Sequence, residues 1–478
     1  MNLDVPLPPS PHSGDVPAAS DHPTIRSRGC YASSVNHKKH RRDTMIRIAH
    51  CTLGGLLVAL LALGTSAGHT QSNTPMNELA ERYVKLVLAM GQHDADYVDA
   101  YYGPDAWRIE AEMAAQTLEQ IGTAVDEALT ELKQIPADAT ELGQMRHQYL
   151  QRQLEALRAR IRMLDGESLA FDDESAALYD AVAPTHADSY FNETLAELEQ
   201  ALPGTGALTD RYAAFRDDFV IDPDHLSQVF EAAITECRRR TLAHVELPPS
   251  ERFTVEYVTD KSWSGYNWYQ GNFRSVIQVN TDLPIYIDRA IDLACHEGYP
   301  GHHVYNVLLE RHLVREQGWP EFSVYALFSP QSLIAEGTAN YGIKVAFPAE
   351  ERLAFEQAVL FPVAGLAASR AAEYYRVQSL VAALDYAGNE AARRYLNGQI
   401  NRAATADWLT RYAMMTPARA EQRTHFFDQY RSYVINYNLG QDLVAAFINA
   451  QSSGAVTDRW NAFAELLASP RLPSGLRD

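Results

Sequence analysis

One short stretch of this chain contains residue types that could bind a metal ion and activate water. It reads His296-Glu297-Gly298-Tyr299-Pro300-Gly301-His302-His303. Imidazole nitrogens are common zinc ligands, and a catalytic zinc site combines three protein ligands with an open position. A neighbouring carboxylate must also take the proton of the water. We therefore predict that His296 is a zinc ligand and that Glu297 is the general base.

The spacing departs from the HExxH pattern, in which both histidines share one face of a helix. Position 300 is proline, and the next histidines follow six and seven residues after His296. On a straight helix, at about 100° per residue, His303 lies about 20° from His296 and His302 about 120° away. Pro300 lacks an amide donor and clashes with the preceding turn, so the helix should kink or bulge. Two residues absorbed in that bulge would bring His302 to the ligand position instead.

A second segment supplies a candidate for the third ligand. Ser329-Pro330 is typical of a helix N-terminus, and Glu336 is the one charge in the apolar and small-residue run 333–340 that follows. Glutamate is rarely buried without a partner. Gly337 and Ala339 would permit close approach to the helix that carries the histidines. The alternatives are a structural ion pair at Glu336 and a metal-free cluster of histidines.

The two motifs together resemble a bacterial family known as domain of unknown function 885, whose members are described as candidate zinc peptidases. The resemblance covers about residues 76–450. It rests on these segments: 269–271, 279–284, 296–303, 335–337, 430–433 and 436–440. What the resemblance implies is a zinc peptidase, with Tyr269 and Asn280 of the shared segments as candidates for substrate binding.

That family in turn resembles helical metallopeptidases with deep channels, which include angiotensin-converting enzyme and the thermostable carboxypeptidases. This resemblance implies one Zn²⁺ ion at the floor of a channel between two helical lobes. Other zinc peptidases whose motif carries an extra residue before a Gly-His pair use that histidine as the ligand. We therefore predict His296, His302 and Glu336 as ligands. His303 is the alternative ligand, or a residue that orients the substrate or supports the ligands.

The reaction also needs a donor for the oxyanion that forms at an attacked carbonyl. The C-terminal segment 425–437 is dense in suitable side chains. We predict catalytic roles for Tyr437 and Arg431 and a substrate-binding role for His425. Core packing is the alternative, because aromatic residues at helical spacing are usually buried.

The rest of the pattern predicts a mainly α-helical fold in one catalytic domain, residues 76–478. Amphipathic helices fill 76–245, of which 141–165 is the clearest. Two runs, 253–258 and 275–280, alternate and are rich in β-branched residues, which is typical of strands. They form a small β-element just before the candidate zinc site. The second strand either pairs with an extended peptide along its edge or belongs to an internal hairpin. We expect Asp282 to cap the next helix.

The N-terminal region lies outside this domain. Residues 1–44 lack apolar periodicity and are predicted to be a disordered extension, which an over-long gene model would explain. Residues 45–67 resemble a signal peptide: a basic start, an apolar run over 52–63, and small residues before a cut after Ala67. This predicts a periplasmic or secreted protein without stable membrane insertion after cleavage. An uncleaved membrane anchor is the alternative.

Charge and composition narrow the class of partner. The 478 residues carry a formal charge of −20, which argues against nucleic acid because phosphate binding needs clustered cations. We predict an exported zinc-dependent peptidase that hydrolyses short peptides, with an exopeptidase or carboxypeptidase-like action. One alternative is a hydrolase of another amide, such as a cell-wall fragment or an acylated amino acid. The other is a non-catalytic peptide-binding protein, against which the intact Glu297 argues.

Overall fold

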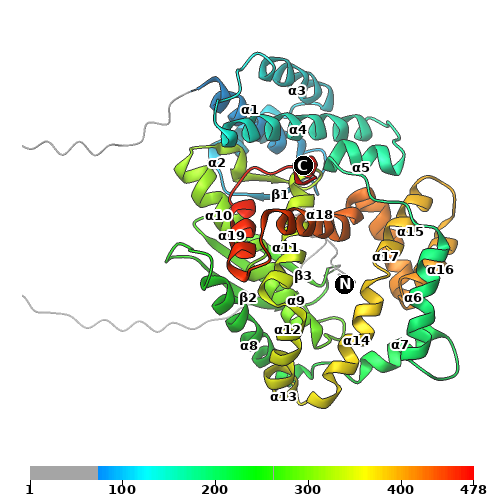
Figure 1. Cartoon of the computed structure of the whole chain (residues 1–478). Coiled ribbons are helices and arrows are strands. Elements are labelled where there is room, and N and C mark those ends of the chain that lie inside the picture. The colour runs from blue at the N-terminus through cyan, green and yellow to red at the C-terminus, as the bar shows by residue number, and fades with distance from the viewer. Residues whose placement is uncertain (1–73, 262, 478) are drawn as a thin grey trace, which may run out of the picture. The chain divides into compact units, whose positions relative to one another are not determined.

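The computed structural model describes residues 74–261 and 263–477 of the chain. The predicted extension (1–44) and the predicted signal peptide (45–67) lie outside these residues. The described part is mainly helical, as the sequence predicts (Figure 1). None of the helices described is both long and apolar enough to cross a membrane.

Between residues 74 and 245 the regular secondary structure is almost entirely helical. Several begin at a threonine or aspartate whose side chain accepts a backbone amide, as at Thr117, Thr140 and Asp222. The predicted helix 141–165 is confirmed as α4. The bounds are α1 Pro75–Met90, α2 Asp105–Ala114, α3 Leu118–Leu132, α4 Glu141–Leu164, α5 Phe171–Tyr179, α6 Asp188–Ala201, α7 Leu208–Asp217 and α8 Pro223–Leu242.

Five strands form two small sheets. The strands are β1 Val98–Tyr101, β2 Arg252–Val258, β3 Gly265–Tyr269, β4 Arg274–Asn280 and β5 Val324–Ala326. β1 pairs antiparallel with β5, although more than 200 residues separate them in sequence. The other sheet has the order β2-β4-β3, with β4 parallel to β2 and antiparallel to β3. Both predicted strands are confirmed, whereas β1, β3 and β5 were not predicted.

The sheet order decides between the two alternatives for β4. The internal hairpin is confirmed, because β3 and β4 pair antiparallel, and the free edge for an extended peptide is wrong, because β4 is the central strand. Its backbone groups bond to β2 on one side and to β3 on the other, so they cannot pair with a substrate. The expected helix start at Asp282 is also wrong. α9 begins at Asp288, because the chain first forms an isolated bridge between Tyr286 and Val220.

The C-terminal half returns to helices, with short π-helical and 3₁₀ turns among them. The α-helices are α9 Asp288–Leu293, α10 His302–Leu309, α11 Pro330–Ala346, α12 Ala349–Phe355, α13 Phe361–Val363, α14 Ala371–Ala382, α15 Tyr386–Leu396, α16 Arg402–Tyr412, α17 Pro417–Tyr430, α18 Ile435–Gln451 and α19 Val456–Leu467. α11 begins at Pro330 as predicted. The Ser329 hydroxyl, however, donates to the Ala326 carbonyl (2.7 Å) and does not cap the helix.

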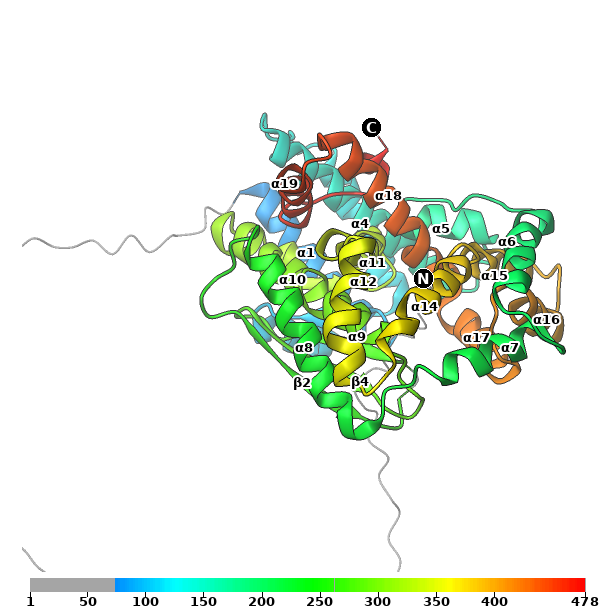
Figure 2. The same ribbon diagram turned by 60° about the horizontal axis from the view of Figure 1, so that its bottom comes forward.

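The centre of the fold is α11, which is buried along almost its whole length and lies beside α18 in both views (Figure 1, Figure 2). Glycines allow this contact. A Cβ atom on Gly337 would lie 2.5 Å from the backbone of Gly440, and one on Gly440 would lie 2.7 Å from the Leu333 carbonyl oxygen. The close approach predicted at Gly337 therefore exists, but its partner is α18 and not the helix that carries His296.

Candidate metal centre

The two histidines of the site are brought together by a break in their helix. α9 continues into a π-helical turn, Ala294–Gly298, and α10 restarts at His302. The Gly301 amide donates to the Cys295 carbonyl (2.8 Å) across the break. A Cβ atom at Gly301 would lie 1.9 Å from the carbonyl oxygen of His296, so the turn requires glycine. The bulge predicted around Pro300 is thus present, and π-turns of this kind are frequent at functional sites.

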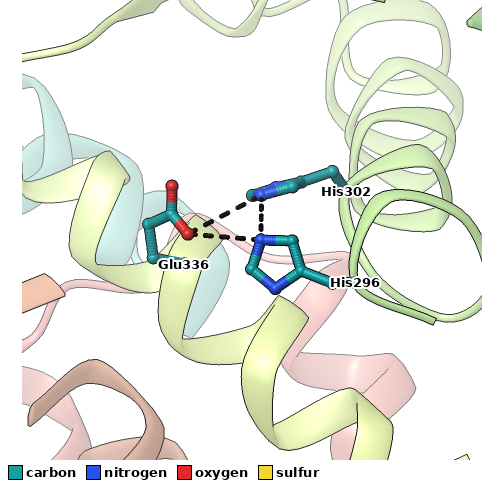
Figure 3. A group of neighbouring side chains, drawn as sticks. All are labelled: His296, His302 and Glu336. Atoms are coloured by element: carbon teal, nitrogen blue, oxygen red, sulfur yellow. Dashed lines mark hydrogen bonds and ion pairs between the residues drawn. The ribbon is translucent and has the colours of Figure 1, made fainter. Parts of the chain in front are cut away.

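Three side chains converge at this break. The Nε2 atoms of His296 and His302 lie 3.1 Å apart, and Glu336 Oε2 lies 3.4 Å from the first and 3.8 Å from the second. Figure 3 shows the three side chains pointing toward one another, with Glu336 approaching from α11. His296 and Glu336 are buried and His302 is nearly so. Of the described residues, these three form the cluster whose geometry could hold a metal ion.

Hydrogen bonds to the far sides of His296 and Glu336 leave His296 Nε2 and Glu336 Oε2 facing the other ligand candidates. His296 Nδ1 lies 2.9 Å from Asn340 Oδ1, which fixes the proton on Nδ1 and leaves the Nε2 lone pair available. Asn340 in turn donates to the Tyr437 carbonyl (3.1 Å). The Tyr433 hydroxyl donates to Glu336 Oε1 (3.0 Å). Glu336 Oε2 is buried and receives no hydrogen bond from the described residues.

The lack of a hydrogen bond at Glu336 Oε2, within the described part of the chain, bears on whether these residues fit a zinc ion. Burying a carboxylate oxygen without a hydrogen bond is unfavourable, and two imidazole nitrogens with one carboxylate oxygen are a known catalytic zinc donor set. The donors also lie close enough for one ion to reach all three. His296, His302 and Glu336 therefore fit a zinc ion.

Electrostatics support different roles for the two glutamates. Burial tends to raise the pKa of Glu336, but its contact with His296 and the nearby His302 outweigh burial and lower that pKa. Burial raises the pKa of Glu297 to about 7, and the charge of Glu336 adds to this shift. Burial also lowers the pKa of His302 to about 4, which keeps the imidazole neutral as a ligand must be.

Glu297, the predicted base, is buried beside β3. Its side chain is 2% exposed, and a Cβ atom on Gly265 would lie 3.1 Å from Glu297 Oε1. Asn267 of the same strand, β3, donates to the Glu297 carbonyl (2.6 Å) and holds the backbone. Within the described residues, no side chain hydrogen-bonds to the Glu297 carboxylate. Its oxygens are therefore available to a water or a substrate.

His303 lies in a separate buried network behind the turn. Its Nδ1 is 2.9 Å from Ser275 Oγ, and its Nε2 is 3.0 Å from Glu251 Oε2. Glu251 also accepts hydrogen bonds from Tyr299 (2.7 Å) and Arg238 (2.6 Å). Both ring nitrogens of His303 are therefore engaged away from His296. The structure places His302 beside His296 and places His303 in a supporting role.

The three candidates from the C-terminal segment, Tyr437, Arg431 and His425, differ in burial and in their partners. Tyr437 is buried, its ring centroid is 5.7 Å from that of Tyr433, and burial followed by the charge of Glu336 raises its pKa. Arg431 Nε instead donates to the buried Glu174 (2.6 Å). The side chain of His425 is 68% exposed and lies near Asp428. Of these three predicted residues, the structure brings Tyr437 closest to the cluster.

The two substrate-binding candidates from the β-element have structural partners. The Tyr269 hydroxyl donates to Glu310, in the helical turn that follows α10. Asn280 Nδ2 donates to the Lys261 carbonyl (2.9 Å), and Asn280 also lines a cavity next to β3. A direct contact of either residue with substrate stays a prediction.

Two residues near the site were not singled out by the sequence. Asn340 lies one turn after Glu336, and the i, i+4 spacing could have identified it as a neighbour on the same face. Asp99 lies at a register irregularity in β1, where Tyr266 donates to its carboxylate (3.2 Å). Burial raises the pKa of Asp99 to about 7, and the charges of Glu336 and Glu297 contribute. No local signal marks Asp99, because only the pairing of β1 with β5 brings it here.

Comparison with known proteins adds little to this geometry. No family model matches the chain, and no curated protein matches it. A candidate lipoprotein from Colwellia psychrerythraea is similar with a TM-score of 0.48 and 14% identity, over 76% of this chain and 62% of its own. A candidate lipoprotein of unknown function from Shewanella oneidensis gives 0.41 and 12%, over 83% and 84%. This chain thus spans less than two thirds of the first of these proteins.

Proposed function

We propose that this chain is an exported zinc-dependent peptidase that hydrolyses short peptides. The observation that carries the proposal is the convergence of His296 Nε2, His302 Nε2 and the unpaired Glu336 Oε2, next to the buried Glu297. A structural ion pair between Glu336 and a histidine would not explain why a second carboxylate, Glu297, lies beside it without a side-chain hydrogen bond from the described residues. Export is proposed on the apolar run at 52–63, and places the protein in the periplasm or outside the cell.

In this proposal His296, His302 and Glu336 hold one zinc ion. When bound, the ion would polarise a water molecule and the scissile carbonyl. Glu297 accepts the proton of that water at its carboxylate and passes it to the leaving amine. A raised pKa suits this task, since the carboxylate must both take and release the proton near neutral pH.

Other residues orient these groups. Asn340 fixes the tautomer of His296, and Tyr433 holds the second oxygen of Glu336. The Tyr437 hydroxyl serves as the donor to the carbonyl oxygen that gains negative charge. We include in the proposal the two-lobed arrangement with a channel that the family resemblance implies. A cavity lined both by residues 280–293 and by α17 supports it.

The direct test is to incubate the zinc-loaded protein with a mixed library of short peptides and to identify the products by mass spectrometry. The proposal predicts cleavage that a chelator abolishes and that added zinc restores. Products that have lost terminal residues would establish exopeptidase action. An intact library, with cleavage of acylated amino acids or cell-wall fragments instead, would favour the alternative amide hydrolase.

A further inference from the structure

A cavity of about 260 Å³ next to the candidate zinc site is lined by basic side chains. Four of its lining residues are cations, namely Arg216, Lys261, Arg289 and Arg419, whereas Asp282 is the one acid. This is unusual in a chain with a formal charge of −20. The cations come from three distant parts of the sequence, so the fold gathers them.

The cavity lies beside the catalytic groups, on the other side of a contact between β3 and Leu293. Leu293 and Ser264 line it, and Arg289 donates to Ser264 Oγ (3.2 Å). A Cβ atom on the next residue, Gly265, would lie 2.6 Å from Leu293 and 3.1 Å from Glu297 Oε1. The wall of the cavity and the Glu297 carboxylate therefore meet at this glycine.

The positive charge in the cavity is only partly neutralised by the protein itself. Within the described residues, neither Arg216 nor Lys261 forms an ion pair. The Arg216 guanidinium stacks on Tyr286, 3.7 Å from the ring centroid. Arg289 lies 3.8 Å from Asp292, beyond hydrogen-bond distance, and its Nη1 has no hydrogen-bond partner in the described part of the chain. Such a site favours an anion.

We propose that this cavity binds a carboxylate of the peptide substrate. The inference rests on the proposed function and deepens it, because it defines the substrate class: peptides with a carboxylate on the side of the scissile bond that faces Arg289. A planar carboxylate matches the fork of donors on a guanidinium. Two sources share this chemistry, the C-terminal carboxylate and the side chain of an aspartate or glutamate near the C-terminus.

The test compares three matched peptides: a free acid, its C-terminal amide, and an amide with glutamate as the last residue. The proposal predicts that the KM for the free acid or for the glutamate peptide is about tenfold lower than that for the plain amide, the effect of one charge-assisted hydrogen bond. The peptide with the lower KM identifies the source. In the double variant Lys261→Gln/Arg419→Gln, this preference should fall to within about twofold.

Arg411→Gln is the matched control, because Arg411 is exposed on α16 and does not line the cavity. It removes one positive charge outside the cavity, against two inside it in the double variant, and the preference should persist in it. Calorimetric binding of the three peptides to Glu297→Gln separates this inference from the peptidase proposal. If the peptides bind in a carboxylate-dependent way but the native protein does not hydrolyse them, the cavity assignment holds and the peptidase proposal fails. Equal affinity for acids and amides in the native protein would overturn it.

Discussion

At the scale of single residues, hydrogen bonds decide which atoms of the cluster remain available to a metal ion. Asn340 engages Nδ1 of His296, and Tyr433 engages Oε1 of Glu336. His296 and Glu336 therefore each present their other atom, Nε2 and Oε2, to the same point. Outer contacts of this kind orient metal ligands, and their loss typically costs about 10- to 100-fold in metal affinity.

The first prediction distinguishes the two neighbouring histidines. His302→Ala should lose zinc, because it removes one of the three converging donors. His303→Ala should keep zinc but unfold more easily, since it leaves Glu251 without one of its buried partners. Zinc per chain, measured after dialysis of both variants, checks this. Loss of metal in the His303 variant alone would reverse the assignment and favour the straight-helix geometry.

The second prediction separates two tyrosines one helical turn apart. Tyr437→Phe should lower kcat more than it raises KM, because a donor to the oxyanion acts mainly in the transition state. Tyr433→Phe should instead weaken zinc binding by about 10- to 100-fold, because it frees Glu336 Oε1. Steady-state kinetics and zinc titrations of both variants provide the measurement. Unchanged kinetics in Tyr437→Phe would show that the Tyr437 hydroxyl has no catalytic role and that the residue only packs in the core.

At the scale of elements, the turn between α9 and α10 depends on a network behind it. Glu251 connects His303, Tyr299 and Arg238. Burial tends to raise the pKa of Glu251, but its hydrogen bonds, first that with His303, outweigh burial and lower the pKa to about 2. The network thus fastens the loop to the N-terminal end of β2, near residue 252.

The third prediction concerns the pH dependence of stability. A carboxyl group with a folded pKa of about 2, below its usual 4.5, stabilises the fold above pH 4.5. This contribution is lost as the pH falls from 4.5 toward 2. Glu251→Gln should lower the free energy of unfolding by about 1–3 kcal/mol at pH 7 and flatten the decline below pH 4.5. Denaturant unfolding with a chelator present, at several pH values, measures both effects. Parallel curves for the variant and the native chain would contradict this role.

Sequence reasoning succeeded where the signal is local. The apolar periodicity of α4, the Ser329-Pro330 start of α11 and the bulge at Pro300 all follow from residue chemistry within a few turns. It left the pairing of β4 open between a free edge and an internal hairpin. The central position of β4 depends on a parallel partner, β2, and a third strand, β3. A β-branched run alone cannot reveal whether both of its edges are occupied.

At the scale of the whole molecule, the site draws on segments from most of the chain. Asp99 comes from β1, the histidines from the region around α10, Glu336 from α11 and Tyr437 from α18. The sequence identified the motif residues because their types are unusual in their local context. It could not place Arg431, whose partner Glu174 lies more than 250 residues away, nor the cationic cavity, whose members are assembled by the tertiary fold.

Zinc analysis combined with kinetics, for the native chain and for Glu297→Gln, tests the proposed zinc-dependent mechanism. We expect one zinc ion per chain in both proteins. We also expect a loss of turnover of about 10²- to 10⁴-fold in the variant, because only the proton acceptor is removed. A native chain that binds no zinc, or a Glu297→Gln variant that hydrolyses peptides at the native rate, would contradict this mechanism.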